Sequence, residues 1–431
     1  MMKTKQMKVV DNKLYMSKWS LEELGKKYGT PLYVYDEEGI DDRIKTYINS
    51  FKSDKFNTHV VYATKAFLCP YLCNIMKKYG VWADAVSLGD MAILEKSGFP
   101  FSHIVLHGNN KTLEELEYAV KNEVGYIVVD NLSELLDLVD IAGTLNKKVK
   151  TLLRVNPGVS AHTHEFIQTA TMDSKFGESI YDDARIEEII NIYKENKYVT
   201  LDGFHAHIGS QISDEESFTK LVHVMAKFIK DIHKKYKLDI HTIDYGGGFG
   251  VKYLDSDKEI DVKRACLNLI NETIKEYENS DILIDTLMIE PGRSIVGDNC
   301  VTVYESRRTK LTYAGVRYAF IDGGMPDNIR PALYDALYTV ENASRVEGTK
   351  VKYNVVGKCC ESGDIIAKGV NLTEVKQGDT LCVYTTGAYS YSMSMNYNGL
   401  TRPACIFVSS DKISVAVRRE TTEDLMKTFE L

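Results

Sequence analysis

Eight short apolar runs between residue 58 and about residue 295 constrain the fold more than any other feature of the chain. They occupy residues 58–66, 81–87, 102–108, 125–130, 149–156, 201–209, 241–250 and 287–294. Helical patterns lie between them, and the runs are apolar almost throughout, as parallel strands covered on both faces should be. Eight strand–helix units over about 240 residues have the size of a (β/α)8 barrel. A doubly wound open sheet is the competing interpretation.

Two of the intervening segments carry recognisable helix signals. Thr112 begins one segment and Glu115 follows three residues later, which is the pattern of a capping box. The next segment is predicted to present one apolar face and to end at Gly143. The members of that face are Leu132, Leu135, Leu136 and Val139.

The pattern changes after about residue 296, where strand-like runs are separated by turn residues and few helical periods occur. The strand-like segment PLYVYD, near the N-terminus, is expected to join this region. We therefore predict a barrel domain over residues 37–295. Residues 1–36 and 296–431 should form a β domain, a barrel of mostly antiparallel strands.

Composition excludes several classes of function. The chain has 53 Lys and Arg against 61 Asp and Glu, a formal net charge of −8, which argues against nucleic acid or an anionic membrane as the partner. No run reaches the roughly 18 apolar residues of a membrane span, and the first residues lack the apolar core of a secretory signal. The eight cysteines have neither zinc-ligand spacing nor a CxxC pair. We expect a cytoplasmic protein with a small-molecule substrate.

Active-site groups of barrel enzymes lie at the carboxyl ends of the strands. The first run ends at Lys65, which could extend its ammonium to the barrel rim or act as a Schiff-base lysine. The sixth ends with His205 and His207 on the same side of the strand. No third ligand lies near them in sequence, so we expect no metal and prefer a ring that lies against a flat cofactor.

The last two runs end in residues suited to an anion. Residues 246–250 read GGGFG, which exposes backbone N–H groups, although glycine also serves tight turns. Glu290 and Arg293 could form a plain ion pair. At a barrel rim, Arg293 could instead hold an anion while Glu290 faces a protonated ring nitrogen. An amine, a phosphate nest, a flat ring and a carboxylate together are what pyridoxal 5'-phosphate requires.

The motifs at these strand ends resemble those of the fold-type III pyridoxal phosphate decarboxylases, which join an alanine-racemase-like barrel to a β domain. They are YATKA at 62, HAHIGSQI at 205, DYGGGFG at 244 and EPGRS at 290. Further motifs resemble the diaminopimelate decarboxylases: YGTPLYVYD at 28, HGNNKT at 107, RVNPGV at 154, DSKFG at 173, DGGMPDNIRPALY at 322, CESGD at 360 and GAYSYSMSMNYNG at 387. They span about 370 residues in the family's order, and their combination is highly specific.

The resemblance implies which residues bind the cofactor. Lys65 forms a Schiff base with pyridoxal 5'-phosphate, His207 stacks on its ring and Glu290 faces its ring nitrogen. The phosphate is bound by Ser210, Gly247, Gly248 and the backbone of Gly292 and Arg293. Tyr389 contacts both cofactor and substrate.

The resemblance also implies how the substrate is bound. Arg293, Arg330 and Tyr334 hold its carboxylates, Glu361 binds its distal amino group and Cys360 donates the proton. The family brings Cys360 and Glu361 from the partner subunit, which implies a homodimer with shared active sites. The chemistry of the substrate agrees with these roles. A substrate with two carboxylates and two amino groups needs a cationic side chain for its distal carboxylate and an anionic one for its distal ammonium group. A thiol is a suitable acid near neutral pH. Without the resemblance, Cys360 would be interpreted as a buried apolar residue.

The resemblance therefore predicts decarboxylation of meso-2,6-diaminopimelate to L-lysine and CO2, the last step of lysine biosynthesis in that family. A sister decarboxylase acting on a D-amino acid, ornithine, arginine or carboxynorspermidine is the nearest alternative, and an inactive regulatory paralogue is a remote one. A racemase is disfavoured, because racemases of this fold place arginine where this chain has Glu290.

Some positions depart from the family's pattern and bear on substrate preference. Asn is usual at Phe67, and Ser-Gly-Gly-Glu is common where this chain has Ser87, Leu88, Gly89 and Asp90. Thr-Gly is usual where Thr169 precedes Ala170, and Cys359 follows Lys358 where Gly-Pro is common.

Overall fold

The computed structural model describes residues 4, 6–159 and 174–430. The chain divides into two compact units. The barrel unit comprises Ile44–Gly250 and Glu259–Gly292, and the β unit comprises Met1–Arg43, Val251–Lys258 and Arg293–Leu431. Each unit is described by itself below.

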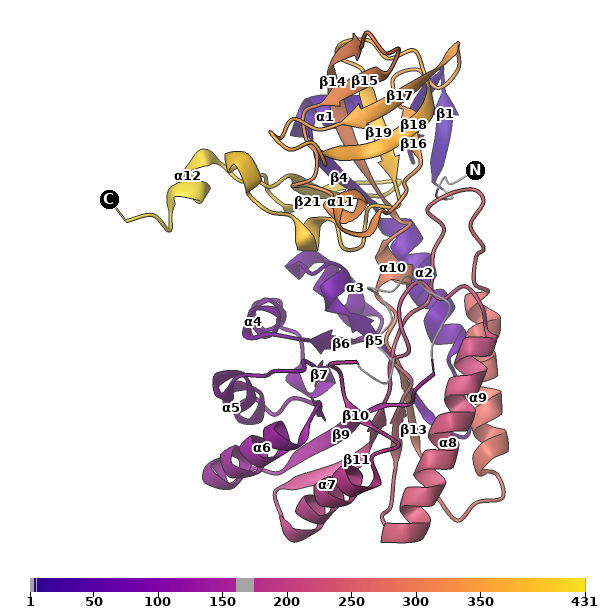
Figure 1. Ribbon diagram of the computed structural model, residues 1–431, viewed down its shortest axis with the longest axis vertical. Coiled ribbons are helices and arrows are strands. Elements are labelled where there is room, and N and C mark those ends of the chain that lie inside the picture. The colour runs from indigo at the N-terminus through magenta and orange to yellow at the C-terminus, as the bar shows by residue number, and fades with distance from the viewer. Residues whose placement is uncertain (1–3, 5, 160–173, 431) are drawn as a thin grey trace. The chain divides into compact units, whose positions relative to one another are not determined.

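The barrel unit is built on eight parallel strands that close on themselves (Figure 1). Their order is β5-β6-β7-β8-β9-β11-β12-β13, and β13 pairs with β5 to complete the ring. The strands are β5 (Asn57–Ala63), β6 (Trp82–Ala85), β7 (Ile104–Leu106), β8 (Tyr126–Val129), β9 (Val149–Asn156), β11 (Val199–His205), β12 (Thr242–Asp244) and β13 (Thr286–Ile289). Each of the eight apolar runs contributes one strand, so the predicted barrel is confirmed and the open sheet is excluded. A two-residue strand, β10 (Glu178–Ser179), pairs in parallel with the last two residues of β9.

Burial on both faces explains why these strands are apolar throughout. Every residue of β7, β8, β12 and β13 is buried. Inside the ring, side chains from alternating positions pack on one another, among them Val61, Val128, Leu152 and Met288. Gly203 lies at a register shift in β11, where an added Cβ would come within 1.8 Å of the backbone oxygen of Thr242. Close approach of β11 and β12 therefore requires glycine there.

Helices surround the ring. They are α3 (Pro70–Lys78), α4 (Leu88–Lys96), α5 (Leu113–Lys121), α6 (Leu132–Leu145), α7 (Asp183–Glu195), α8 (Glu216–Tyr236) and α9 (Val262–Tyr277). Helix α2 (Glu37–Ser50) carries the chain from the β unit into the barrel unit. The capping box predicted at Thr112 and Glu115 is confirmed at the start of α5.

The predicted apolar face of α6 is wrong in part. Leu135 is buried as expected, but Leu136 is 49% exposed, and the buried face continues through Leu138 and Ala142. The helix also passes through Gly143 and ends at Asn146, which adopts the left-handed conformation. The packing of α6 on the barrel selects the i, i+3, i+7 positions, and an isolated glycine is tolerated inside a helix that is otherwise well packed.

The β unit contains a branched, nine-stranded mixed sheet. Six of its strand pairs are antiparallel, and the pairs β15–β17 and β4–β20 are parallel. The strands are β4 (Leu32–Asp36), β14 (Cys300–Leu311), β15 (Arg317–Ile321), β16 (Val340–Asn342), β17 (Lys350–Val356), β18 (Ile365–Thr373), β19 (Thr380–Tyr384), β20 (Ala404–Val408) and β21 (Ile413–Val417). As predicted, the PLYVYD segment joins this sheet: β4 lies between β14 and β20.

The N-terminal residues and a few short helices complete the β unit. The first strands, β1 (Met7–Val10), β2 (Lys13–Met16) and β3 (Trp19–Ser20), form a small antiparallel sheet. The helices are α1 (Leu21–Tyr28), α10 (Arg293–Val296), α11 (Arg330–Tyr334) and α12 (Thr422–Met426).

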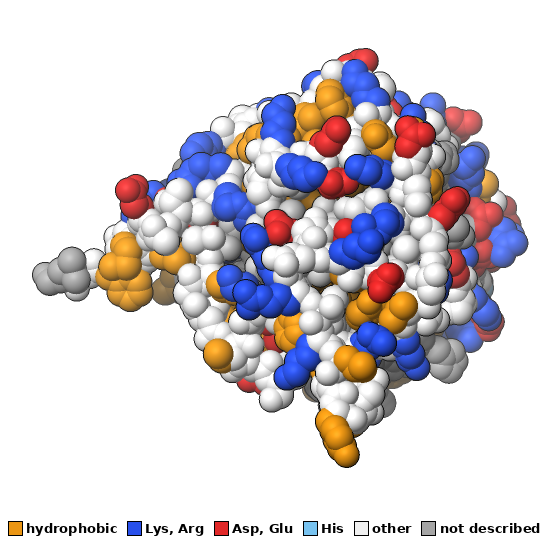
Figure 2. Space-filling model, turned by 90° about the horizontal axis from the view of Figure 1, so that it is seen from above, with side chains coloured by type: hydrophobic (Ala, Val, Ile, Leu, Met, Phe, Trp, Pro, Cys, Tyr) orange, Lys and Arg blue, Asp and Glu red, His pale blue; other side chains and the backbone are white. Residues whose placement is uncertain are grey.

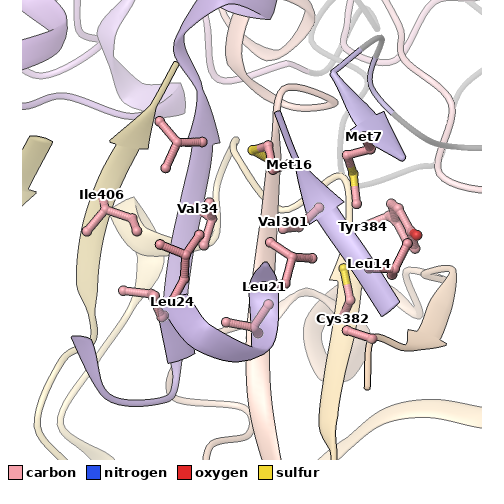
Figure 3. Packing of buried hydrophobic residues seen from close by; sticks show 14 of the residues in the cluster. Met7, Leu14, Met16, Leu21, Leu24, Val34, Val301, Cys382, Tyr384 and Ile406 are labelled. Carbon is pink, nitrogen blue, oxygen red and sulfur yellow. The ribbon is translucent and has the colours of Figure 1, made fainter. Parts of the chain in front are cut away.

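One apolar core of the β unit joins segments that are far apart in sequence (Figure 3). Leu14 and Leu21 from the N-terminus pack with Val34, Val301 and Ile406, all of them fully or almost fully buried. Truncating such a leucine to alanine typically costs about 2–5 kcal/mol. The N-terminal residues are therefore an integral part of this unit.

The face shown in Figure 2 carries Lys and Arg side chains interspersed with Asp and Glu. Among the residues that the structure describes, no helix combines the length and the apolar character needed to cross a bilayer.

Candidate functional site

Lys65 lies immediately after strand β5, in a short 3-10 helix formed by Thr64–Ala66. Its side chain is exposed, so the lysine is at the rim rather than inside the barrel. Asp84, near the end of β6, is buried and accepts hydrogen bonds from the backbone N–H of Thr64 at 2.9 Å and from its hydroxyl at 3.2 Å. Burial raises the pKa of Asp84, and the charge of Lys65 acts against that rise. Asp84 thus fixes the turn that carries Lys65.

Glu290 follows β13, the strand that pairs with β5, and is held by two histidines. Its Oε1 lies 2.5 Å from Nε2 of His107, and its Oε2 lies 3.3 Å from Nε2 of His205. All three side chains are buried. Burial opposes ionisation, but the two histidines outweigh it and hold the pKa of Glu290 well below its usual value. The carboxylate is therefore an anion at neutral pH.

Asp244 ends β12 beside this group. Its Oδ1 accepts the backbone N–H of Gly246 at 2.9 Å. Burial, and then the charge of Glu290, raises the pKa of Asp244 well above its usual value. Burial also lowers the pKa of His205 to about 4. Of the two neighbouring carboxyl groups, Glu290 carries the charge and Asp244 the proton, as expected when like charges share a buried site.

His107, His205, Asp244 and Glu290 offer atoms within 4.8 Å of one another, a spacing that could hold a metal ion. The argument from sequence that His205 has no further ligand nearby is therefore wrong, because it considered only neighbours along the chain. His207 does not belong to this group. In this structure the four side chains interact with one another directly: Glu290 pairs with His107 and His205, and the pKa of Asp244 beside them is raised.

His207 adjoins the glycine loop. Its Nδ1 accepts the backbone N–H of Gly247 at 3.2 Å, so the proton of the neutral ring is on Nε2. Burial, and then the charge of Lys65, holds the pKa of His207 well below its usual value. A neutral ring with a fixed tautomer is suited to lie against a planar group.

The glycines of this loop are required by packing. A Cβ at Gly247 would come within 2.2 Å of the backbone oxygen of Glu290, and one at Gly248 within 2.4 Å of that of Gly209. Gly248 also has a φ of +108°. At Gly292, a Cβ would lie 2.7 Å from that of Ala63. These glycines bring the ends of the strands close together, whatever their role toward a ligand.

The barrel unit fits pyridoxal 5'-phosphate in its chemistry. Lys65 supplies an amine and Glu290 an anion for a ring nitrogen. Buried beside Glu290, Nδ1 of His205 has no hydrogen-bond partner in the described part of the chain. Unsatisfied buried polar atoms are rare in proteins and are typical of a site that completes its contacts with a ligand.

In the β unit, Arg293 and Arg330 converge on Tyr253. The hydroxyl oxygen of Tyr253 accepts from Nη1 of Arg293 at 2.5 Å and from Nη1 of Arg330 at 3.0 Å. The Arg293 guanidinium also lies 4.6 Å from the ring centre of Tyr389, and that of Arg330 lies 5.7 Å from the ring centre of Tyr334. Four of the predicted site residues thus lie around a tyrosine that the sequence did not single out.

Cys360 and Glu361 lie on an exposed turn whose backbone is held by hydrogen bonds to two side chains. The backbone N–H of Cys360 donates to Oδ1 of Asn398 at 2.9 Å. The buried carboxylate of Asp364 accepts from the N–H groups of Cys359 at 2.8 Å and Met325 at 2.7 Å. The interpretation of Cys360 as a buried apolar residue is wrong, because that side chain is exposed.

The thiol of the neighbouring residue, Cys359, differs from that of Cys360 in exposure. Cys359 is only partly exposed, and burial, followed by the charge of Asp364, raises the pKa of Cys359 to about 12.

The positions that depart from the family's pattern have structural roles of their own. Phe67 is fully buried, and its backbone oxygen accepts from the hydroxyl of Tyr62 at 2.8 Å. Asp90 accepts the N–H of Val86 at 2.9 Å, and the N–H of Leu88 donates to Glu115 at 3.1 Å. Thr169, Ala170 and Asp173 lie outside the described residues.

Several residues of the candidate site were missed by the sequence analysis: Asp84, His107 and Asp244 in the barrel unit, and Tyr253 and Asn398 in the β unit. A signal existed for two of them, since His107 directly follows an apolar strand and Asp244 ends one. Lys111, in the HGNNKT motif, donates to Glu134 at 2.7 Å and to the oxygens of Gly108 and Val128. It anchors the loop that carries His107.

Known proteins resemble this chain along most of its length. Residues 38–297 match the family described as pyridoxal-dependent decarboxylase, pyridoxal binding domain. A diaminopimelate decarboxylase of Bacillus subtilis is 39% identical over 405 residues, which cover 94% of this chain and 92% of the relative. One of Staphylococcus aureus is 38% identical over 418 residues and covers 96% and 97% of the two chains.

A solved structure agrees with the architecture. The diaminopimelate decarboxylase of M. jannaschii in co-complex with L-lysine is 30% identical and superimposes with a TM-score of 0.93. The match covers 99% of this chain and 98% of the other.

Proposed function

The chain belongs to the diaminopimelate decarboxylase family of pyridoxal-dependent decarboxylases, and from this premise we propose that it converts meso-2,6-diaminopimelate to L-lysine and CO2. This is the last step of lysine biosynthesis. The observation that carries the proposal is the pairing of β5 with β13. The pairing brings the strand followed by an exposed lysine beside the strand followed by a carboxylate that two histidines keep ionised.

The barrel unit would hold the cofactor. Bound pyridoxal 5'-phosphate supplies an electron sink for the charge left at Cα when a carboxylate departs. We assign Lys65 to bind its carbonyl carbon, His207 to lie against its ring and Glu290 to keep its ring nitrogen protonated. Its phosphate is assigned to Ser210, Gly247, Gly248 and the backbone of Gly292 and Arg293. The proton on Asp244 and the N–H groups of the histidines keep the negative charge on Glu290, as this role requires.

The β unit would recognise the substrate. Arg293, Arg330 and Tyr334 are assigned to its carboxylates, Glu361 to its distal ammonium group and Tyr389 to both cofactor and substrate. A planar guanidinium suits a carboxylate because it donates two parallel hydrogen bonds. Cys360 is assigned to deliver a proton to Cα after CO2 has left. Its exposure and the pinned backbone of its turn suit a group that must reach a substrate.

We also propose that the enzyme is a homodimer in which Cys360 and Glu361 serve the active site of the other subunit. The exposure of both residues on one turn of the β unit supports this proposal.

The deciding experiment is lysine release by the purified protein loaded with pyridoxal 5'-phosphate. It is given meso-diaminopimelate, with D-lysine and D-ornithine alongside. Selective turnover of diaminopimelate is the expected result. Preference for a monocarboxylate substrate would move the chain to a sister decarboxylase. No turnover of any substrate by protein that retains bound cofactor would favour the inactive paralogue.

A further inference from the structure

Tyr253 has no role in the family resemblance, yet it lies at the centre of the cationic group of the β unit. Its side chain is buried, and its hydroxyl oxygen is the shared acceptor for Arg293 and Arg330. Tyr338 packs edge-on against its ring, with the ring centres 5.3 Å apart and the planes at 89°. Tyr253 is thus fixed in position before any ligand binds.

The contact with Tyr253 determines which part of Arg330 is left for a ligand. A guanidinium group can bind a carboxylate along its side edge, through Nε and Nη2, or along its end, through both Nη atoms. Tyr253 occupies one of the two N–H donors of Nη1. The Nε of Arg330 is buried and has no hydrogen-bond partner within the described part of the chain. The side edge is therefore the one presented to a carboxylate.

Tyr253 also reduces the electrostatic cost of holding two cations together. Burial favours the neutral phenol, but the charges of Arg293 and Arg330 outweigh it and lower the pKa of Tyr253. The shared oxygen places partial negative charge between two guanidinium groups that would otherwise repel each other. Phenylalanine at this position would fill the same space without that charge.

We propose that Tyr253 is a positioning residue that orients Arg330 so that its side edge binds the carboxylate retained in the product. By this means Tyr253 sets the preference for a dicarboxylate substrate over a monocarboxylate one. This inference rests on the proposed function, since it assigns a carboxylate to Arg330.

Two ligands that differ by a single carboxylate test the proposal. L-lysine carries the retained carboxylate, and cadaverine is the same diamine without it. Calorimetry on the enzyme loaded with cofactor should show that Tyr253→Phe weakens L-lysine binding by about tenfold, as for the loss of one charge-assisted hydrogen bond, and leaves cadaverine binding unchanged. In turnover, KM for meso-diaminopimelate should rise more than kcat falls.

Tyr353→Phe is the matched control. Tyr353 is buried in the same apolar cluster as Tyr253, and its hydroxyl accepts one backbone hydrogen bond, from Val375 at 3.3 Å. This variant should bind both ligands as the wild type does. If it weakens L-lysine binding as much as Tyr253→Phe, the effect comes from the packing of the core and the proposal is wrong.

A double-mutant cycle shows whether Tyr253 acts through Arg330. The effect of Tyr253→Phe on L-lysine binding should largely disappear in an Arg330→Ala background, because the group that it orients is gone. Additive effects, or equal weakening of L-lysine and cadaverine, would overturn the proposal. Failure of the wild type to turn over diaminopimelate would remove the proposed function instead, and the two-ligand comparison would still decide the role of Tyr253.

Discussion

Nε2 of His107 lies 2.5 Å from Oε1 of Glu290, although 183 residues separate the two in the chain. His107 follows β7 and Glu290 follows β13. The closed ring makes this contact possible, because the carboxyl ends of all eight strands meet at one end of the barrel. Together with His205, His107 keeps Glu290 ionised in a buried position where a carboxylate alone would take up a proton.

The charge on Glu290 can be removed with little change in shape. Glu290→Gln should lower kcat by about a hundredfold or more, because a neutral amide does not keep a ring nitrogen protonated. The absorbance of the bound cofactor should shift while the amount bound changes little. Glu123→Gln, on the exposed surface of the same unit, is the control and should leave both unchanged. Wild-type kcat in Glu290→Gln would contradict the assignment.

The role of Lys65 has a direct chemical readout. Borohydride should fix pyridoxal 5'-phosphate covalently to the wild-type chain, and peptide mapping should place the label on Lys65. Lys65→Ala should retain no label and should lose at least about a thousandfold in turnover, since covalent capture of the substrate depends on this amine. A label on another lysine of the wild type would show that Lys65 is not the residue that binds the cofactor covalently.

Two residues at the base of the Cys360 turn should control proton delivery. Asp364→Ala removes the acceptor for the N–H groups of Cys359 and Met325, and Asn398→Ala removes the acceptor for that of Cys360. Either change should lower kcat by about tenfold, because small displacements of a reacting group are costly, and should leave cofactor binding unchanged. Asn122→Ala, at the end of helix α5, serves as a control for loss of an asparagine.

The rate at which iodoacetamide alkylates Cys360 gives a second readout for these variants. It should change in both of them and not in Asn122→Ala. An unchanged kcat in both would mean that the turn keeps its shape without these contacts.

Much of the fold could be predicted because local patterns and global architecture agree. Each apolar run between residues 58 and 294 contributes a strand, since burial on both faces leaves few polar positions in a barrel strand. The apolar face of α6 was harder to place. Leu136 and Leu138 are equally apolar, and only the packing of the helix on the barrel decides which of them is buried.

Within the candidate site, the residues at strand ends could be found from sequence and their partners could not. Lys65 and Glu290 stand out because a charge directly follows an apolar strand. The contacts of His107 with Glu290 and of Tyr253 with Arg330 join residues that no local pattern connects. The same limit explains the mistaken argument about ligands near His205: chain spacing does not measure distance across a closed ring.

The β unit contains a carboxyl group that should make stability depend on pH. Asp327 is buried, its Oδ2 accepts the N–H of Gly324 at 2.9 Å, and burial raises the pKa of Asp327 to about 7. The folded state therefore holds a proton that the unfolded chain releases at lower pH. This contribution to stability is complete below the ordinary pKa of an aspartate and is lost as pH rises through about 7.

Denaturant unfolding from pH 4 to 8 measures this dependence. From Asp327 alone, the free energy of unfolding should fall by about 1.4 kcal/mol per pH unit between the ordinary pKa of an aspartate and about pH 7, and should level off above it. Asp327→Asn, which cannot ionise, should remove that slope. The stability of this variant relative to the wild type should therefore be greater at pH 8 than at pH 4. Asp335→Asn, at an exposed position, should keep the wild-type slope. Parallel curves for Asp327→Asn and the wild type would show that Asp327 does not hold its proton.

A mixing experiment tests the shared active site. Lys65→Ala and Cys360→Ala should each be nearly inactive alone. If Cys360 serves the other subunit, a mixed dimer contains one site with both defects and one site with neither. Equal amounts that exchange subunits at random should therefore regain about a quarter of wild-type activity. If Lys65 and Cys360 of the same chain serve one site, each site of a mixed dimer keeps one defect and the mixture stays inactive.

Subunit exchange must be shown independently, and a size tag on one variant allows the mixed dimer to be isolated. The isolated mixed dimer should have about half of wild-type activity, because one of its two sites is intact. A variant carrying both substitutions on one chain, mixed with wild type, gives the opposite pattern. Its mixed dimer has one defect in each site and should be nearly inactive when sites are shared. Activity in that dimer, with none in the first, would place Cys360 in the active site of its own chain.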